Sequence, residues 1–159
     1  MKVMIIINIV LLIILLLNIY RYKFISTELK AMRKNVQRMD YLFQLSNQWI
    51  IRTTNGNKIS SNLEDLNVST IAIYGMGELG ERLMEEILIN SSLKLLYGMD
   101  RNANEMKMVI PIYTLEEACN MEKPDIIVLS TYVDNESLKK EIENKMECKV
   151  IMLGDVLNV

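Results

Sequence analysis

The sequence predicts an α/β protein built on a parallel sheet of about five strands, with a long helical segment before it. Short apolar runs alternate with amphipathic helical patterns from residue 70 onward, which is typical of a parallel sheet with helices on both faces. A glycine-rich turn joins the first of these runs to its helix. An almost unbroken apolar run occupies residues 3–19. Together these observations place a sheet, a binding motif and a membrane anchor in one chain.

Each element of the α/β part has its own local pattern. Thr70–Tyr74 and Leu93–Met99 are predicted to be strands, with a helix over Leu79–Ile89 between them. Asp125–Thr131 is largely apolar, as expected for a strand buried on both faces. The other predicted elements are a helix over Lys58–Leu66, a short strand over Met108–Tyr113 interrupted by Pro111, helices over Leu115–Asn120 and Glu136–Met146, and a final strand over Lys149–Leu153.

The turn after the first strand reads Gly75-Met76-Gly77-Glu78-Leu79-Gly80. This G-x-G-x-x-G spacing between a strand and a helix is typical of dinucleotide-binding folds. The first glycine permits a tight turn, the second lets a pyrophosphate approach the backbone, and the third lets the helix pack closely on the strand. The start of the helix also offers unpaired N–H groups to an anion. The pattern predicts a minimal Rossmann-like, doubly wound fold that binds nucleotide phosphates; the alternative is the same fold with glycines kept for packing and no ligand.

Two other segments follow strands whose carboxyl ends meet at the same edge, where ligands of open parallel sheets bind. Asp100 is predicted to accept hydrogen bonds from ribose or sugar hydroxyls, and Arg101 could offer charge to a 2′-phosphate. Ser130 and Thr131 are predicted to line the pocket as hydroxyl donors, and Tyr132 to stack on a base. The alternatives are that Asp100 caps a turn, that Arg101 is solvated, and that Ser130 and Thr131 simply end a strand.

Residues 1–20 are predicted to form a transmembrane signal-anchor helix. The apolar run of about 18 residues would extend about 27 Å, close to the thickness of a bilayer core. A cleaved signal peptide is the alternative, but the bulky and basic segment Tyr20–Phe24 does not resemble a cleavage site. Basic residues follow the run in excess, which places everything after residue 20 in the cytoplasm and the N-terminus outside.

Residues 21–52 carry a second pattern. The apolar positions alternate in spacings of four and three residues along Ile25, Leu29, Met32, Val36, Met39, Phe43, Ser46 and Ile50. This heptad seam predicts a juxtamembrane coiled coil that makes the protein a homo-oligomer through residues 21–50. The alternatives are an amphipathic helix packed on its own domain or lying on lipid. Trp49 is expected to close the helix and to anchor it on the domain formed by residues 53–159.

The charge distribution bears on the partners of that domain. Residues 53–159 contain ten basic and eighteen acidic side chains, which argues against nucleic acid as a partner because phosphate backbones need a positive surface. Cys119 and Cys148 lack the spacing of a metal site, and no metal is predicted. The chain has no histidine for acid–base chemistry near neutral pH. Glu78 could act as a base, but a first-turn glutamate more simply complements the helix dipole.

The segment from Trp49 through Gly56, Lys58, Ile59 and Leu63 to the glycine motif and Met99-Asp100-Arg101 resembles small Rossmann-like domains of bacterial surface-polysaccharide gene clusters. These are similar to nucleoside-diphosphate-sugar epimerase-like and CoA-binding-like domains, and the resemblance covers roughly residues 49–157. It implies NAD or a nucleotide-sugar as ligand, and a glycosyltransferase or another capsule or exopolysaccharide assembly enzyme as partner. The membrane span is not part of the resemblance; taken with it, the predicted location is a bacterial cytoplasmic membrane.

Catalysis is not expected from this chain alone. The epimerases and dehydratases that it resembles use a tyrosine with a lysine four residues later, and no tyrosine here has one at that spacing. The favoured hypothesis is therefore a membrane-anchored accessory protein that binds a nucleotide-sugar or NAD without turnover. The alternatives are a subunit of a dehydratase, epimerase or oxidoreductase whose catalytic residues come from a partner, and an oligomeric scaffold with a vestigial pocket.

Overall fold

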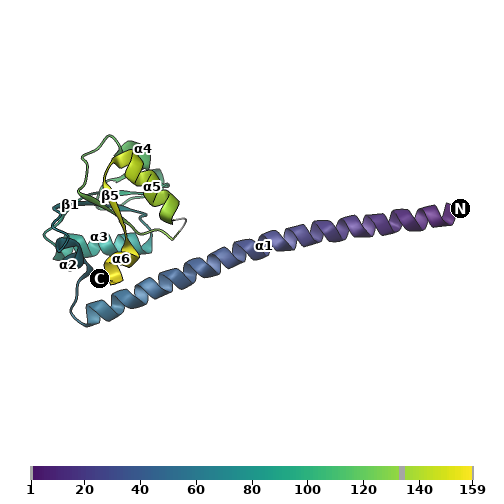
Figure 1. Ribbon diagram of the computed structural model, residues 1–159, viewed down its shortest axis with the longest axis horizontal. Helices are drawn as coiled ribbons and strands as arrows, with labels where there is room; N and C mark the ends of the chain where they lie inside the picture. The colour runs from purple at the N-terminus through teal and green to yellow at the C-terminus, as the bar shows by residue number, and fades with distance from the viewer. Residues whose placement is uncertain (1, 133–134, 159) are drawn as a thin grey trace. The chain divides into compact units, whose positions relative to one another are not determined.

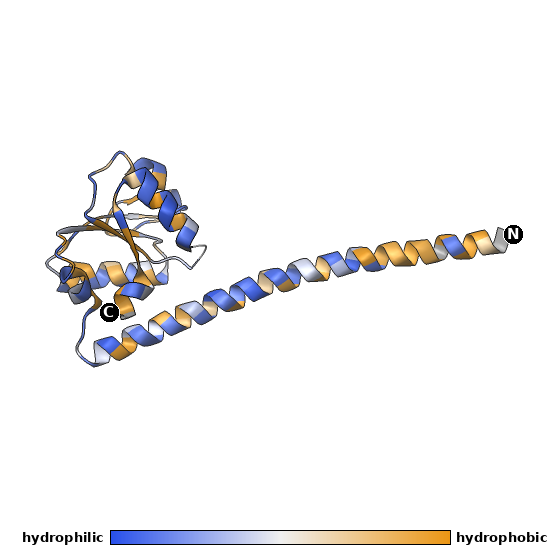
Figure 2. Ribbon diagram, viewed as in Figure 1, coloured by the Kyte–Doolittle hydropathy of each residue, from blue (hydrophilic) through white to orange (hydrophobic). Residues whose placement is uncertain are grey.

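The computed structural model describes residues 2–132 and 135–158. The chain divides into two units between Asp40 and Tyr41, and the first helix, α1 (Lys2–Thr54), runs through the division. Within the first unit, α1 contains a window of mean hydropathy 2.4 with none of it buried, and Figure 2 shows the apolar colour concentrated toward its N-terminal end. By length and composition this helix could cross a membrane. The side-chain amide of Asn18 donates to the carbonyl of Ile14 at 2.9 Å in the same helix.

The second unit contains a five-stranded, fully parallel sheet with the strand order β3-β2-β1-β4-β5. The central strand β1 (Thr70–Tyr74) pairs with β2 (Lys94–Met99) on one side and β4 (Ile126–Leu129) on the other. β3 (Ile112–Tyr113) and β5 (Lys149–Met152) form the two edges. The chain therefore reverses its direction of winding at β1, which confirms the predicted Rossmann-like fold class.

Helices cover both faces of this sheet (Figure 1). The core on one face includes residues of α2 (Ile59–Glu64), α3 (Glu78–Asn90) and α6 (Leu153–Asn158). The core on the other face includes residues of α4 (Leu115–Ala118) and α5 (Asn135–Met146). Alternate residues of β1 enter the two cores, Ile71 and Ile73 the first and Ala72 and Tyr74 the second, as the two-residue period of a strand requires.

The last part of α1, residues 41–54, belongs to the second unit. Leu45 is 5% exposed and joins the core of α2, α3 and α6, with Trp49 packed against it. The indole Nε1 of Trp49 donates to Glu86 Oε2 at 3.1 Å, and the backbone N–H of Ser60 donates to Glu86 Oε1 at 2.8 Å. Glu86 therefore joins α1 and α2 to α3, and the prediction that Trp49 anchors the helix on the domain is confirmed. The compact unit accordingly includes residues 41–54 of α1.

Several element bounds differ from those predicted. α1 does not close at Trp49 but continues to Thr54, and the following turn contains Gly56 at a φ of 78°. β3 is confined to two residues that follow Pro111, whose ring nitrogen has no hydrogen to donate to a ladder. The predicted final strand ends one residue early, because Leu153 begins α6. A 3₁₀ turn, η1 (Ala103–Glu105), and α6 itself were not predicted.

Two carboxylates, Asp125 and Glu64, hold strand and helix ends, and they make stability depend on acid pH. Backbone N–H groups of Ser69 and Thr70 hold the pKa of Asp125 below its ordinary 3.8. The backbone N–H of Ser92, assisted by nearby serine hydroxyls, holds the pKa of Glu64 below its ordinary 4.5. A lowered pKa in the folded state stabilises the protein above the ordinary pKa and loses that effect as pH falls through the folded value.

We therefore expect the melting temperature to fall as the pH drops below about 4.5, the ordinary pKa of a glutamate. The double variant Asp125→Asn, Glu64→Gln should start from a lower melting temperature at pH 7 and show a smaller acid decrease. Glu85→Gln, on the exposed side of α3, is the matched control and should follow the parent. Melting curves of the three proteins from pH 3 to pH 7 would test this. If the melting temperature of the double variant fell with acid as much as that of the parent, Asp125 and Glu64 would not be the source of the pH dependence.

Candidate nucleotide-binding site

The candidate site lies at the carboxyl end of β1, where the segment Gly75–Gly80, here called the glycine loop, leads into α3. The chain reverses winding direction here, between β1 and β4, and open α/β sheets bind ligands at such a point. No side chain caps the start of α3 at Gly77. The first-turn N–H groups of a helix lack partners within the helix, so this turn presents donors and partial positive charge to the site.

Two of the three motif glycines are required by the protein's own packing. Gly75 has a φ of 96°, and a Cβ there would lie 2.3 Å from Thr131 Cγ2. At Gly80 a Cβ would lie 2.1 Å from the carbonyl oxygen of Gly75. The first glycine thus brings the loop against the end of β4, and the third lets α3 pack on the loop. Both positions act as the motif predicts.

Gly77 differs from the other two. It has a φ of −82°, which any residue can adopt, and a Cβ at this position would have nothing within 4 Å. It is also exposed, at the start of α3. Neither backbone conformation nor packing therefore requires glycine at this position, whereas a pyrophosphate lying against the backbone would.

Asp100 and Ser130 hold the glycine loop from its two sides. Asp100 Oδ2 accepts from the backbone N–H of Met76 at 2.9 Å, and its Oδ1 accepts from that of Asn102 at 2.9 Å. The buried hydroxyl of Ser130 contacts the carbonyl oxygens of Tyr74, at 3.1 Å, and Gly75. The hydrogen of Ser130 is thus used within the protein, and Asp100 caps a turn. Each carboxylate oxygen of Asp100 retains a lone pair for a ribose hydroxyl.

The remaining predicted residues lie around this centre. Thr131 contacts the loop at Gly75, and Glu78 is exposed at the first position of α3. Tyr132 packs against Tyr41 of α1, with ring centroids 5.3 Å apart at 48°, so in the structure its ring contacts an aromatic ring of the protein. Arg101 lines a hollow of about 190 Å³ together with Tyr74, Thr114, Leu115, Glu116, Leu138 and Glu141. Several of these residues belong to the core of α4 and α5, so Arg101 is directed toward the opposite face of the sheet from α3.

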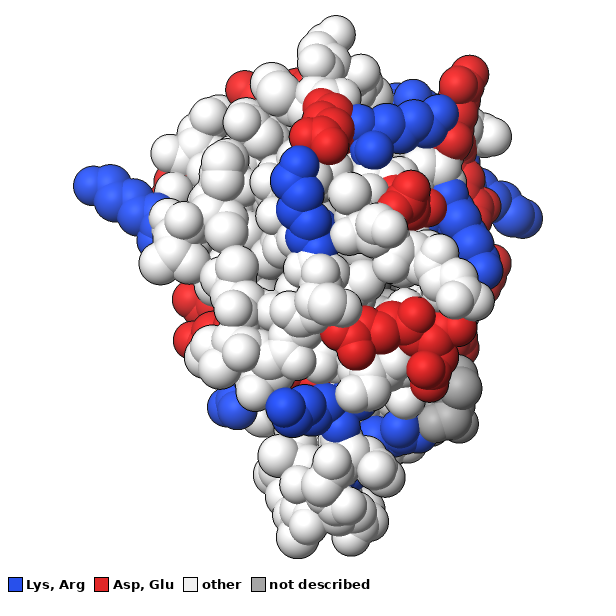
Figure 3. Space-filling model, turned by 90° about the vertical axis from the view of Figure 1, so that its left-hand side faces the viewer, with Lys and Arg blue, Asp and Glu red and all other residues white. Residues whose placement is uncertain are grey.

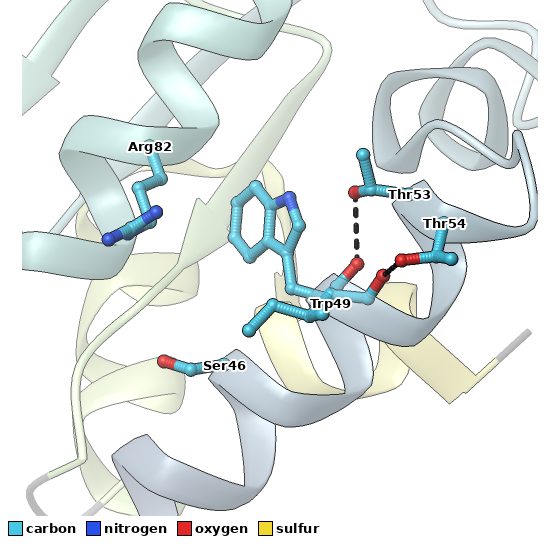
Figure 4. Close-up of a pocket in the computed structure, with 6 residues that line it drawn as sticks. Ser46, Trp49, Thr53, Thr54 and Arg82 are labelled. Carbon is cyan, nitrogen blue, oxygen red and sulfur yellow. Dashed lines mark hydrogen bonds between the residues drawn. The ribbon is translucent and has the colours of Figure 1, made fainter.

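A second hollow, of about 360 Å³, lies between the end of α1 and α3 (Figure 4). The indole of Trp49 and the side chain of Arg82 form two of its sides, and Ser46, Ile50, Thr53 and Thr54 form the rest. The hydroxyls of Thr53 and Thr54 bond to carbonyls of their own helix, at 2.9 and 2.8 Å. Sequence reasoning missed this hollow because its residues come from two helices that carry no shared motif.

Tyr97, in β2, is held in its neutral form. Burial, followed by nearby cysteine and glutamate charges, raises the pKa of Tyr97 to about 12, and its hydroxyl donates to the carbonyl of Glu122 at 3.0 Å. Within residues 2–132 and 135–158, no group of three or more His, Cys, Asp or Glu side chains could hold a metal ion. On the face drawn in Figure 3, acidic and basic side chains are interspersed, in keeping with the mixed charge of residues 53–159.

Comparison with known proteins adds a structural likeness. No protein-family model matches the chain, and no curated protein matches it. The crystal structure of RSP, a Rex-family repressor, is similar with a TM-score of 0.45 and 17% sequence identity, over 57% of this chain and 56% of that one. The matched part thus spans little more than half of each protein, and a likeness of this strength carries no information on ligand or activity.

Proposed function

We propose that this protein is a membrane-anchored nucleotide-binding protein that holds NAD or a nucleotide-sugar without converting it. The observation that carries this proposal is the open space at Gly77. Gly75 and Gly80 are required by packing within the protein, but Gly77 is required by nothing in the structure. A pyrophosphate beside the backbone of Gly77 would accept hydrogen bonds from the unpaired N–H groups at the start of α3. Its close approach to the backbone would explain why glycine occupies this position.

The rest of the site agrees with this ligand. Asp100 ends the strand next to β1, and its carboxylate, already placed by Met76, can accept ribose hydroxyls through its remaining lone pairs. The same negative charge would repel a 2′-phosphate, which favours NAD over NADP. The resemblance to surface-polysaccharide domains supports capsule or exopolysaccharide assembly as the setting, with a glycosyltransferase or related enzyme as partner. The apolar start of α1 and the basic residues after it support a single-pass anchor with this domain in the cytoplasm.

The proposal is tested by adding a side chain at Gly77. Serine is preferred at the first cap position of a helix, so Gly77→Ser should fold with an unchanged or slightly raised melting temperature. Its hydroxyl should cap α3 and occupy the place of the phosphate. Because one hydrogen bond to a charged group contributes about 1.5–3 kcal/mol, we expect affinity to fall about 10- to 100-fold.

The measurement is calorimetry on the full chain in detergent, titrated with NAD, NADP, UDP-sugars and GDP-sugars. Gly154→Ala is the matched control, because it also adds a side chain to a glycine with room, 3.6 Å from Leu45 and away from the loop. It should bind as the parent does. A parent that binds none of these compounds, or a Gly77→Ser variant of full affinity, would contradict the proposal.

A further inference from the structure

The apolar side chains of the heptad seam of α1 are exposed. The side chains of Ile25, Leu29 and Met32 are 51%, 60% and 63% exposed. Phe43 and Ile50, which continue the seam within the second unit, are 69% and 64% exposed. An apolar row of this length in contact with water is unfavourable, so the seam is expected to have a partner.

Within the second unit, the chain's own domain does not cover the apolar side chains of the seam, Phe43 and Ile50. Within residues 41–54 the buried face of α1 is formed by Leu45 and Trp49. Leu45 lies roughly 160° around the helix from Phe43, since each residue turns the helix by about 100°. Phe43 and the packed residue Leu45 therefore lie on opposite sides of the same helix, and Phe43 and Ile50 stay exposed after the domain has packed.

The lipid bilayer does not cover most of the seam either. This step rests on the membrane anchor of the proposed function. Residues 2–54 form one helix without glycine or proline, the residues at which helices usually break. A helix that leaves the membrane along its own axis carries Met39 roughly 30 Å beyond Ile19, at about 1.5 Å per residue. Most of the seam therefore lies out of reach of the bilayer.

The charges beside the seam fit a second copy of the same helix. Leu29 and Val36 take the a positions and Met32 and Met39 the d positions, which places Glu28 at g and Arg33 at the following e. In a parallel, in-register coiled coil, a residue at a g position of one helix lies next to the residue at the following e position of the other helix. Glu28 is the sole acidic residue between positions 2 and 40. Its g position would place it beside Arg33 of a second copy, as an ion pair requires.

Glu28 has no comparable charge within its own helix. The residues three and four positions away are Phe24, Ile25, Ala31 and Met32, and residues five apart do not face each other on one helix. The salt bridges at Lys94, Lys123 and Lys145 do not involve Glu28. A Glu28–Arg33 contact is thus available between two chains and not within one.

We propose that α1 binds a second copy of this chain as a parallel, in-register coiled coil over residues 25–50, with Glu28 of each helix paired to Arg33 of the other. The anchors favour the same direction, because two copies in one membrane insert in parallel. Ser46 and Ile50 line the hollow of Figure 4, and the second helix would cover that side of it.

Cysteine cross-linking of the full chain in membrane vesicles tests the seam. Cys119 and Cys148 are first replaced by alanine, and a single cysteine is placed at Met32 on the seam or at Lys34 on the opposite side. Oxidation is expected to trap a dimer through Met32→Cys and to leave Lys34→Cys monomeric. Equal trapping at both positions, or none at Met32, would overturn the proposal, and quenching of a fluorophore at Met32 by spin-labelled lipid would assign this face to the membrane.

A charge exchange tests the register. In the Met32→Cys background, Glu28→Arg should lower the dimer fraction, by roughly fivefold in the association constant, and adding Arg33→Glu should restore it. Failure of the second change to restore the dimer would overturn the parallel, in-register arrangement. The anchor is judged separately: a chain in the soluble fraction would refute it, yet Met32 cross-linking there would still support the seam.

Discussion

Alanine at Gly80 is expected to destabilise the fold by at least about 3 kcal/mol, a large part of the stability of a small domain. The added Cβ would lie 2.1 Å from the carbonyl oxygen of Gly75 and 3.0 Å from Ser130 Oγ. The first of these is a backbone atom that no side-chain rotation can move. α3 would therefore have to shift away from β1, opening the core in which Leu79 and Leu83 pack.

Gly77→Ala is the matched control, because it adds the same methyl group three residues earlier in the same loop. Nothing lies within 4 Å of that methyl group, and a change below about 1 kcal/mol is expected from the weaker helix cap alone. Urea denaturation followed by circular dichroism would measure both variants. If Gly80→Ala unfolds at the same urea concentration as Gly77→Ala, the close contact between α3 and the loop does not limit stability.

Leu45→Asp and Phe43→Asp are expected to have opposite consequences although they are two residues apart. Leu45 is 5% exposed and packs among hydrophobic side chains in the core of the second unit. We expect a loss of about 3–5 kcal/mol, because an uncompensated buried charge is among the most destabilising changes. The last part of α1 should then separate from α2 and α3, exposing Trp49 to solvent and shifting its fluorescence.

Phe43→Asp should leave that fluorescence and the melting temperature of the α/β domain unchanged, because its side chain is 69% exposed. It should instead reduce cross-linking through Met32→Cys, since it places a charge at an a position of the seam. Measuring both readouts on both variants separates the two faces of α1. A variant at Phe43 that unfolds the domain would show that the assigned faces are wrong.

The sheet was predictable from sequence because its central strands are buried on both faces. Thr70–Tyr74 was predicted with the bounds that the structure has, and the apolar run around Ile126–Leu129 contains β4. The elements that were missed are short and depend on tertiary contacts. α6 has one turn of apolar positions, Leu153, Val156 and Leu157, too few to separate a helical period from the end of a strand.

The candidate site was predictable in its backbone and less so in its side chains. The spacing of the glycine loop identified the turn, the start of α3 and the close packing at Gly80, because those features depend on local geometry. The hydrogen-bond partner of Asp100 could not be inferred, since it depends on how near the end of β2 lies to Met76. The contact of Tyr132 with Tyr41 joins residues ninety-one positions apart, and no local pattern indicates it.

The glycine loop is ordered before any ligand arrives, and this limits what binding can signal. Asp100 holds it through Met76, and Ser130 holds it through Tyr74 and Gly75. A ligand shifts a conformational equilibrium only by binding two states unequally, and a loop fixed at both sides offers one state. If a nucleotide binds as proposed, the loop would keep its conformation, and a partner would recognise the occupied site by the chemistry of the nucleotide itself rather than by a change in the protein.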